Sequence, residues 1–252
     1  MRSGSNLDYV QVNKKHWNSA YQRYNPERAK YLKLIKAGYP YLEKTEPKIG
    51  RYLRNIKGKK IIVPQFGDGL LLLACAKKGA LVTGVDISSE QIRLAKKGAR
   101  YCGVDVVLIE SDWQRLPKTV SDNSFDIAVT ECGIFIWIKS LDAWMRNAYR
   151  VLKKGGRLIV SDFHPLAMCT KDQQNGESVI LARSYFDQQP QICHEKDAPP
   201  SIEFMWKLSD IINAAIDAGF HLDHLEEYYV KEKAKKTPMI PTDFLIVATK
   251  GN

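Results

Sequence analysis

The amino-acid sequence predicts an α/β fold, a doubly wound and mostly parallel sheet of seven strands with an antiparallel hairpin at its edge. Three observations predict it. From residue 59 onward, short apolar runs rich in β-branched residues alternate with helical segments, which is typical of βαβ units. The first apolar run ends in a glycine-rich turn that leads directly into a helix. The last two apolar runs are joined through Pro238 and Pro241 without a helix, which favours an antiparallel pair.

The apolar runs and the segments between them place the elements in order. Five strands are expected in series, at residues 60–65, 81–86, 106–110, 125–130 and 157–162. The helices between them are expected at residues 70–78, 89–101 and 141–151. A further helix at 207–218 is stopped by Gly219 and is followed by the two edge strands, at residues 220–230 and 244–249.

Two segments lie outside this alternating pattern. Residues 6–55 are rich in Tyr and Lys and are expected to form an N-terminal helical lid, which leaves residues 56–252 as the main domain. Residues 165–205 are too long for an ordinary connection and are expected to be an insertion that faces the substrate. Four aromatic residues of the lid are candidates to close over a substrate, with ordinary helix packing as the alternative: Tyr9, Trp17, Tyr21 and Tyr24.

Composition excludes several classes of protein. With 44% hydrophobic and 26% charged residues, the chain falls in the globular range, outside the disordered and low-complexity classes. The five cysteines are scattered and form no CxxC pair, so we expect neither disulfides nor a metal site, and we expect a reducing, cytoplasmic location. No apolar run approaches the roughly 20 residues that cross a bilayer, so no membrane partner is expected.

Chemistry in an open α/β sheet is expected at the carboxyl ends of the strands. The first strand ends in the sequence QFGDG at residues 65–69, where glycines allow a ligand to approach the main chain. Asp86 ends the second strand, seventeen residues after Gly69, and its carboxylate can accept both hydroxyl hydrogens of a ribose. These features predict an adenosine-type ligand with a free diol. The alternative is that Asp86 or Ser88 only caps the helix that begins near Ser89.

Dinucleotides and S-adenosylmethionine both fit this pair of features. A dinucleotide site wants a third glycine at the position of Leu72, and Asp68 would repel a pyrophosphate, so the dinucleotide is disfavoured. After the third strand, Asp112 can accept a hydrogen bond from an adenine amino group and Trp113 can offer an apolar plane beside the ring. A loop acid and a partly buried Trp are the alternative.

Five motifs in joint order resemble those of the class I S-adenosylmethionine-dependent methyltransferases. They are GDG at 67–69, VDIS at 85–88, SDW at 111–113, SFDI at 124–127 and LKKGGRL at 152–158. The resemblance covers residues 57–165, and the edge hairpin agrees with the seventh strand of that family. It implies a Rossmann-like methyltransferase domain of the small-molecule type, with S-adenosylmethionine as the cofactor.

The resemblance also implies how the cofactor is held. The glycine turn would contact the methionine end and Asp86 the ribose, while Thr130 or Glu131 would lie beside the sulfonium. The chain departs from the first motif at Val63, where an acid is usual, and at Gln65, where a glycine is usual. An amide at the second position can replace contacts to the methionine group. Ile87, Asp112 and Trp113 would contact the adenine. The expected cofactor-binding residues are Gln65, Gly67, Asp68, Gly69, Asp86, Ile87, Asp112, Trp113, Thr130 and Glu131.

A sulfonium methyl is already activated, so alignment and exclusion of water matter most and a catalytic base is optional. If the acceptor carries a proton, His164 and Glu131 are the candidate catalytic residues, followed by Asp162. For His164, a turn or capping role is the alternative. Cys132 is expected to be a buried thiol rather than a nucleophile.

We therefore expect methyl transfer to a small-molecule acceptor by in-line displacement. An RNA methyltransferase is a second hypothesis, because the chain carries a net charge of +10, but its lysine pairs are spread along the sequence and no separate RNA-binding domain is evident. A third is a non-catalytic protein that retains the fold, because Val63 and Gln65 depart from the first motif. A homodimer is left open.

Overall fold

The computed structural model describes residues 8–20, 26–171, 179–229 and 240–251. Its centre is a seven-stranded sheet with the order β3-β2-β1-β4-β5-β9-β8. The first five strands are parallel, whereas β9 runs antiparallel between β5 and β8. The predicted α/β sheet with its antiparallel edge pair is thereby confirmed. The strands are β1 (Lys60–Pro64), β2 (Leu81–Asp86), β3 (Val106–Glu110), β4 (Phe125–Glu131), β5 (Leu152–Phe163), β8 (Phe220–Tyr228) and β9 (Asp243–Lys250).

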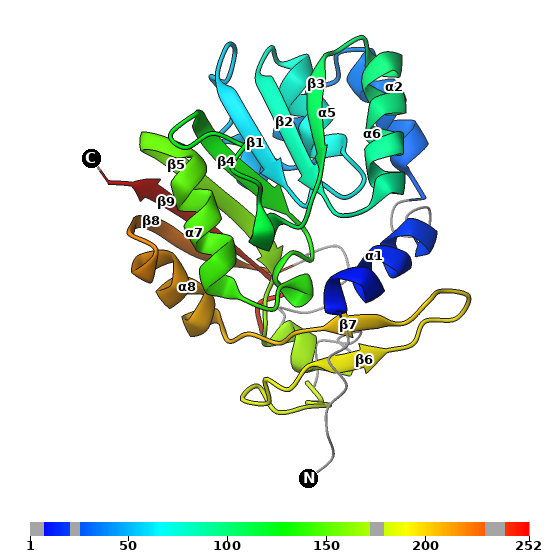
Figure 1. The fold of residues 1–252 in the computed structure, drawn as a ribbon, viewed down its shortest axis with the longest axis vertical. Coiled ribbons are helices and arrows are strands. Elements are labelled where there is room, and N and C mark those ends of the chain that lie inside the picture. Colours follow the sequence, from blue (N-terminus) through cyan, green and yellow to red (C-terminus); the bar gives the residue numbers. More distant parts are fainter. Residues whose placement is uncertain (1–7, 21–25, 172–178, 230–239, 252) are drawn as a thin grey trace.

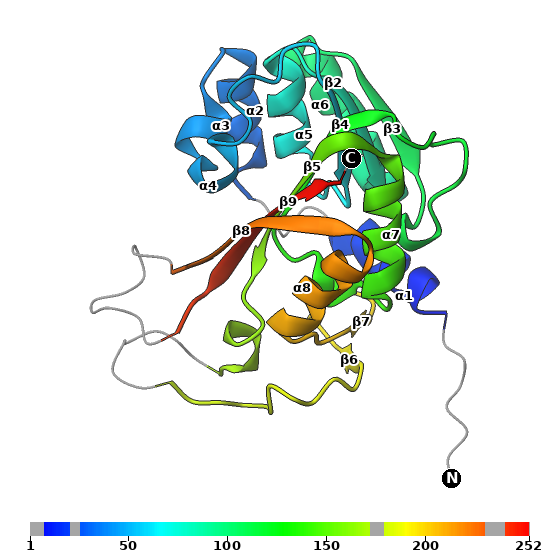
Figure 2. The same ribbon diagram turned by 90° about the vertical axis from the view of Figure 1, so that its left-hand side faces the viewer.

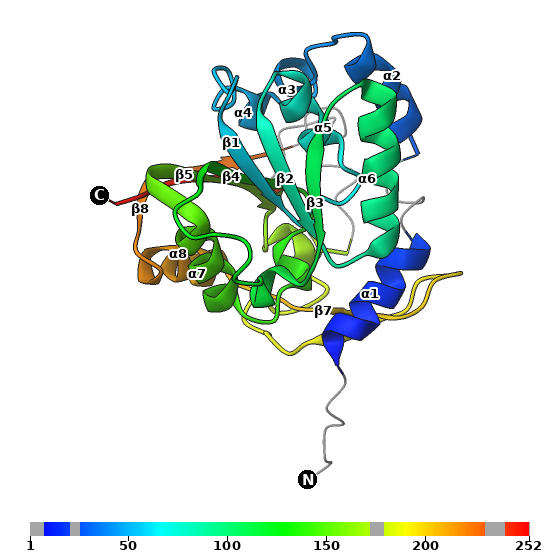
Figure 3. The same cartoon turned by 45° about the horizontal axis from the view of Figure 1, so that its top comes forward.

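Helices cover both faces of the sheet (Figure 1, Figure 3). On one face, α7 and α8 enclose a core around Trp144 and Phe244. On the other, α5 and α6 lie against the strands, and α2 packs on both of these helices. None of the described helices has the length and apolar character that a membrane span requires. The helices on these faces are α2 (Arg28–Lys36), α3 (Tyr41–Lys44), α4 (Pro47–Gly50), α5 (Leu70–Lys77), α6 (Ser89–Cys102), α7 (Leu141–Val151) and α8 (Leu208–Asp217).

Local sequence signals account for the ends of the two longest helices on the sheet. Ser88 is the N-cap of α6, and its hydroxyl accepts a hydrogen bond from Gln91 N at 3.2 Å. Gly103 ends that helix with a φ of 64°, which glycine adopts without strain. Ser140 caps α7 in the same way as Ser88 caps α6, so both helices begin where the strand-end loops stop.

The fifth strand is longer than the sequence predicts, because it begins at Leu152 rather than at 157. Gly155 has a φ of 69°, and the pairing of β4 with β5 shifts register between Phe125 and Ile127. Gly155 and Gly156, which precede the expected strand at 157–162, therefore lie within the observed strand, where the pairing is irregular. The first edge strand ends at Tyr228, and Pro238 of its connection to β9 lies outside the described residues.

Leu72 packs where sequence reasoning expected a glycine in a dinucleotide site. A Cβ added at Gly84 of β2 would lie 2.3 Å from Leu72 Cδ1. The close approach of helix α5 to the sheet is thus provided by a glycine on the strand, and the helix carries the bulky partner. The turn therefore lacks the third glycine that a dinucleotide site requires.

The N-terminal helix and the insertion meet at the carboxyl ends of the strands. In Figure 1 and Figure 2, α1 (Tyr9–Ala20) and the small sheet of β6 (Gln191–Cys193) and β7 (Ser201–Glu203) lie at that end of the molecule. Asn13, buried on α1, donates to Ile202 O at 2.9 Å and accepts from Ile202 N at 2.7 Å. His16 Nδ1 lies 2.8 Å from Pro199 O. The two segments, almost 190 residues apart in sequence, therefore form one cap.

The lid expected at residues 6–55 divides into two parts. Among the described residues, α1 lies over the strand ends, whereas α2 and α3 pack against α5 on one face of the sheet. Residues 21–25, which include the candidate lid residues Tyr21 and Tyr24, lie outside the described part of the chain. The division of the chain at residue 55 stays a prediction.

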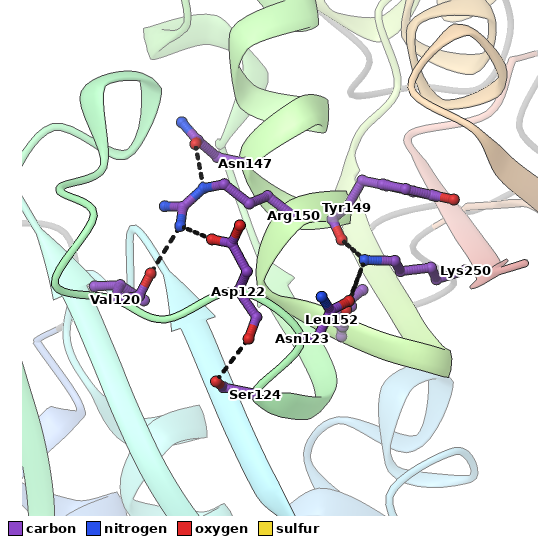
Figure 4. Close-up of polar contacts among 9 residues, drawn as sticks. All are labelled: Val120, Asp122, Asn123, Ser124, Asn147, Tyr149, Arg150, Leu152 and Lys250. Carbon is purple, nitrogen blue, oxygen red and sulfur yellow. Dashed lines mark hydrogen bonds and ion pairs between the residues drawn. The ribbon is translucent and has the colours of Figure 1, made fainter. Parts of the chain in front are cut away.

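The far end of the sheet is closed by polar contacts of Lys250 and Arg150 (Figure 4). Lys250 Nζ donates to Tyr149 O at 2.7 Å, to Leu152 O at 2.9 Å and to Asn123 Oδ1 at 2.8 Å. Arg150 Nη1 bonds Val120 O at 2.7 Å and Asp122 Oδ1 at 2.6 Å. Carbonyl groups at the C-terminus of α7 lack partners within the helix, so the ammonium of the last strand satisfies them. These contacts hold β9 against α7.

Candidate functional site

A cavity of about 550 Å³ lies at the carboxyl ends of the parallel strands, under the cap formed by α1 and the insertion. Loops after β1, β2, β3 and β4 form its floor, as expected for an open α/β sheet. Two candidate lid residues, Tyr9 and Trp17, contribute to the wall from α1. Of the residues expected from the sequence, eight line this cavity: Gln65, Gly67, Asp68, Asp86, Ile87, Asp112, Trp113 and Glu131.

The glycine turn after β1 leaves room beside the main chain. Gly67 has a φ of 51°, and a Cβ added there would meet no atom within 4 Å. Gly69, with a φ of 78°, is the N-cap of α5 and is not part of the cavity wall. Gln65, in place of the usual glycine, adopts a φ of 49°, and its Oε1 accepts from Trp144 Nε1 at 2.7 Å. The amide oxygen of Gln65 is thus held by the core, and its amino group is directed to Ile134 O at 3.5 Å.

The Asp86 carboxylate joins the first two strand-end loops. Its Oδ2 accepts from Gly67 N at 3.1 Å and its Oδ1 from Ser88 N at 2.9 Å. Burial raises the pKa of Asp86 to about 6, although these backbone hydrogen bonds oppose the shift. Because Ser88 caps α6, Asp86 does not serve as the cap of that helix. A carboxylate has about four acceptor positions, so further hydrogen bonds from a ligand remain open to it.

The loop after β3 carries a buried acceptor. Asp112 Oδ1 accepts from Gln114 N at 2.9 Å, whereas Asp112 Oδ2 is buried with no hydrogen-bond partner among the described residues. Trp113 is almost fully buried, and its indole nitrogen donates to Trp144 O at 3.1 Å. Its ring therefore packs in the core against Trp144, with 5.9 Å between the ring centroids, and is not an exposed plane. Burial, with Asp112 as the next contribution, raises the pKa of the neighbouring Tyr9 to about 12.

Glu131, after β4, faces a second carboxyl group that the sequence did not single out. Glu46, which precedes the short helix α4, lies within hydrogen-bond contact of Glu131. Burial raises the pKa of both groups. The charges of Glu46 and Asp68 raise the pKa of Glu131 further, and the hydrogen bond between the two carboxyl groups raises the pKa of Glu131 and lowers that of Glu46. Glu131 Oε2 is buried with no hydrogen-bond partner in the part of the chain that the structure describes. In those same residues, no three His, Cys, Asp or Glu side chains are arranged as metal ligands.

Asp162, at the end of β5, organises the loop that follows β4. Its two oxygens accept backbone hydrogen bonds from Gly133 at 2.5 Å, Ile134 at 3.0 Å and Phe135 at 2.9 Å. Burial raises the pKa of Asp162 to about 6. Because these bonds occupy the carboxylate, Asp162 supports the cavity wall and is not available as a base.

Cys132 differs from the expectation of a buried thiol, because it is exposed at the cavity with a φ of 59°. Desolvation, followed by the nearby Glu131 carboxyl, raises the pKa of its thiol. The thiol therefore stays protonated at neutral pH and is a poor nucleophile.

Besides Gly69, two expected residues are absent from the cavity wall. Thr130 is buried, and its hydroxyl donates to Pro64 O at 2.7 Å, which links β4 to β1. His164 is also buried: its Nδ1 accepts from Leu166 N at 3.1 Å, and its Nε2 lies 2.9 Å from Glu227 Oε1 on β8. Burial lowers the pKa of this histidine, and Glu227 opposes the shift. The geometry corresponds to the turn role that was the alternative, so we assign His164 no part in catalysis.

Sequence reasoning missed several residues of the cavity wall. Gln114 directly follows the SDW motif and Gln91 lies in the first turn of α6, so their positions beside motif residues were a usable signal. Glu46 and Trp137 gave none, because Glu46 precedes one short helical turn and Trp137 lies in another, and the positions of both turns depend on tertiary packing.

Comparisons with known proteins fit this geometry. Residues 64–160 match the family described as a methyltransferase domain. An uncharacterised protein of Haemophilus influenzae is 24% identical over 192 residues, which are 72% of this chain and 75% of that protein. Demethylmenaquinone methyltransferase of Thermus thermophilus is 35% identical over 99 residues, but the match spans only 39% of this chain and 44% of that enzyme.

Solved structures share the fold at low sequence identity. An S-adenosylmethionine-dependent methyltransferase structure from Listeria monocytogenes has a TM-score of 0.64 at 19% identity, covering 80% of this chain and 97% of that one. Magnesium protoporphyrin IX methyltransferase of Synechocystis, solved with bound S-adenosylmethionine, has a TM-score of 0.62 at 16% identity, covering 99% of this chain and 100% of the other. Residues 64–160 of the chain thus match a methyltransferase domain, and the chain shares the fold of solved S-adenosylmethionine-dependent methyltransferases.

Proposed function

We propose that the protein transfers the methyl group of S-adenosylmethionine to a small molecule held in the cavity under α1 and the insertion. The observation that carries the proposal is the cavity itself. Its volume of about 550 Å³ lies within the range of small-molecule sites, and a cap made of two distant segments encloses it. The named methyltransferase relatives include an enzyme for demethylmenaquinone, which is a small molecule.

Two unpartnered oxygens support a cofactor in the floor of the cavity. Asp112 Oδ2 and Gln91 Oε1 are buried, belong to residues of the cavity wall, and have no hydrogen-bond partner among the described residues. Leaving a buried acceptor unpaired is costly, so a ligand that offers donors fits this place. We assign the adenine amino group to Asp112, the ribose hydroxyls to Asp86, and the methionine end to the open space beside Gly67.

The remaining wall suits an acceptor beside the methyl group. When bound, the cofactor supplies a methyl group on a sulfonium, which an acceptor lone pair displaces from sulfur. The loop held by Asp162 places Ile136 and Trp137 at this wall, and the insertion adds Met168. These apolar side chains exclude water and fix the direction of approach, which contributes most to this type of transfer.

The charged residues of the cavity wall disfavour the RNA alternative. Although the chain carries a net charge of +10, no Lys, Arg or His lies among the described residues of the wall. A phosphate backbone requires cationic contacts, so this entrance is unsuited to RNA. The wall instead contains seven acidic residues: Glu46, Asp68, Asp86, Asp112, Glu131, Glu195 and Glu203.

The proposal is tested by titrating S-adenosylmethionine and its thioether product into the protein by calorimetry. We expect both to bind at one site per chain. In parallel, incubation with methyl-labelled cofactor and a metabolite extract is expected to move label into a small product, and none into an RNA fraction. Absence of binding at about 1 mM cofactor would instead favour the non-catalytic hypothesis.

A further inference from the structure

The cavity wall carries a pair of carboxyl groups to which the assignment of adenine, ribose and methionine end gives no role, although the sequence resemblance places one of them, Glu131, beside the sulfonium. Asp86 and Asp112 face the nucleoside, whereas Glu46 and Glu131 contact one another on the wall. Two carboxyl groups in hydrogen-bond contact must share a proton, since two carboxylates offer no donor. Burial raises the pKa of both groups, so they retain this proton closer to neutral pH than ordinary glutamates do. The pair is therefore a proton acceptor of raised basicity that opens on the cavity.

One positive charge acts on this pair, because Lys48 lowers the pKa of Glu46. The Lys48 ammonium is also shared with other groups, since it lies 3.4 Å from Asp243 Oδ2 and 4.4 Å from the centre of the Tyr228 ring. The other groups that act on the pair are acidic: Asp68 from the glycine turn and Asp243 from β9. Tyr41, also on the wall, has a pKa raised by burial and then by Glu131. Among the charged groups that act on the pair in the described residues, the acids outnumber the one ammonium.

Aromatic rings complete the same wall. Trp17 and Trp137 meet edge to face with 5.2 Å between their centroids, and both line the cavity with Tyr41. The faces of such rings attract cations, and the attraction grows where water is excluded. Acids and aromatic faces together are a combination that binds ammonium groups and rejects carboxylates and phosphates.

The position of Glu46 in the chain associates the pair with the acceptor. The residues assigned to the cofactor come from loops at the ends of β1, β2 and β3, within or beside the matched domain at 64–160. Glu46 precedes that domain and comes from the N-terminal segment, which with the insertion forms the part of the wall outside it. The acceptor-facing wall thus combines Glu131 of the domain with Glu46, which the domain alone does not provide.

We infer that the methyl acceptor is a small-molecule amine, methylated on nitrogen, whose ammonium group binds at Glu46 and Glu131. The inference rests on the proposed methyl transfer. The amine enters protonated and gives one proton to the carboxyl pair. Its lone pair then forms the N–C bond while the S–C bond breaks and its electrons stay on sulfur. The product is a methylated ammonium ion, and the proton held by the pair is released to solvent.

A matched series of probes tests this inference in the protein saturated with the thioether product: 2-phenylethylamine, 2-phenylethanol and 3-phenylpropionate. Calorimetry at pH 7.5 is expected to show the amine binding at least about ten-fold more tightly than the alcohol, with the carboxylate weakest. The variant Glu46→Gln is expected to lower amine affinity about ten-fold and to leave alcohol affinity unchanged. Glu27→Gln, an acid of the same segment paired with Lys30 at the surface, is the matched control and should change neither.

The same titrations distinguish the possible failures. Equal binding of amine and alcohol, preference for the carboxylate, or no detectable amine binding overturns the inference. A Glu46→Gln variant that loses affinity for the cofactor and its thioether product equally also overturns it, because the pair would then hold the methionine group. Binding of the thioether product to the unmodified protein reports on the proposed function alone. Thermal unfolding of Glu46→Gln shows whether the variant is folded.

Discussion

Replacing Asp162 by alanine is expected to lower the free energy of unfolding by about 4 kcal/mol. The carboxylate accepts hydrogen bonds from the backbone N–H groups of Gly133, Ile134, Phe135 and Phe163. Removing it leaves buried donors unpaired, and each such group costs on the order of 1–3 kcal/mol when the structure cannot relax around it. Urea unfolding followed by tryptophan fluorescence measures the loss.

The matched control is Asp142→Ala on α7, because that carboxylate is exposed and lies 3.7 Å from Arg146. This surface pair should contribute little, and stability is expected to change by no more than about 0.5 kcal/mol. The free energy of unfolding of Asp162→Ala could instead differ from that of the unmodified protein by less than about 1 kcal/mol, the contribution of one hydrogen bond. In that case the loop after β4 does not depend on this carboxylate. Its role as the support of the cavity wall would then be wrong.

Replacing Asp86 by asparagine is expected to weaken the binding of S-adenosylmethionine about a hundred-fold. Two charge-assisted hydrogen bonds to ribose hydroxyls contribute about 3 kcal/mol, which corresponds to that factor. Calorimetric titration gives the dissociation constants, and Asp105→Asn, at an exposed position before β3, is the control. Unchanged affinity in a folded Asp86→Asn protein would reject the ribose role.

The pKa of about 6 at Asp86 adds a pH dependence to this prediction. Only the ionised carboxylate accepts both hydroxyl hydrogens, so affinity is expected to fall about ten-fold from pH 7 to pH 5 and to be flat in Asp86→Asn. Stability without cofactor changes in the opposite direction. Between about pH 4 and 6 the folded protein holds a proton that the unfolded chain has lost, so the contribution of Asp86 to stability falls as pH rises. A cofactor affinity that does not vary from pH 5 to 7 contradicts the assignment.

The sheet was predictable because each strand is a short apolar run bounded by turn residues. β1, with Ile61 to Val63 fully buried, is such a run. The start of β5 was missed because Gly155 continues the strand through an irregular ladder, whereas a glycine pair in sequence resembles a loop. The part played by Asn13 was not predictable either, since its hydrogen bonds reach a backbone almost 190 residues away.

The residues of the candidate site likewise divide into those that local sequence located and those whose position depends on distant packing. Asp86 and Asp112 follow strands directly, and a strand end in a parallel sheet has a fixed place, so local sequence located them. His164 also follows a strand, but its ring turns toward Glu227 on β8, which the sequence cannot reveal because β9 separates β8 from β5. Glu46 reaches the cavity only through the packing of the N-terminal helices. A homodimer stays a prediction.

The central claim is that the adenosine of the cofactor lies across the strand ends, between Asp86 and Asp112. A crystal structure of the protein with the thioether product tests it most directly. The account predicts both ribose hydroxyls within hydrogen-bond distance of the Asp86 carboxylate and the adenine amino group on Asp112 Oδ2. A nucleoside bound elsewhere, or side chains filling the cavity at saturating ligand, would contradict it.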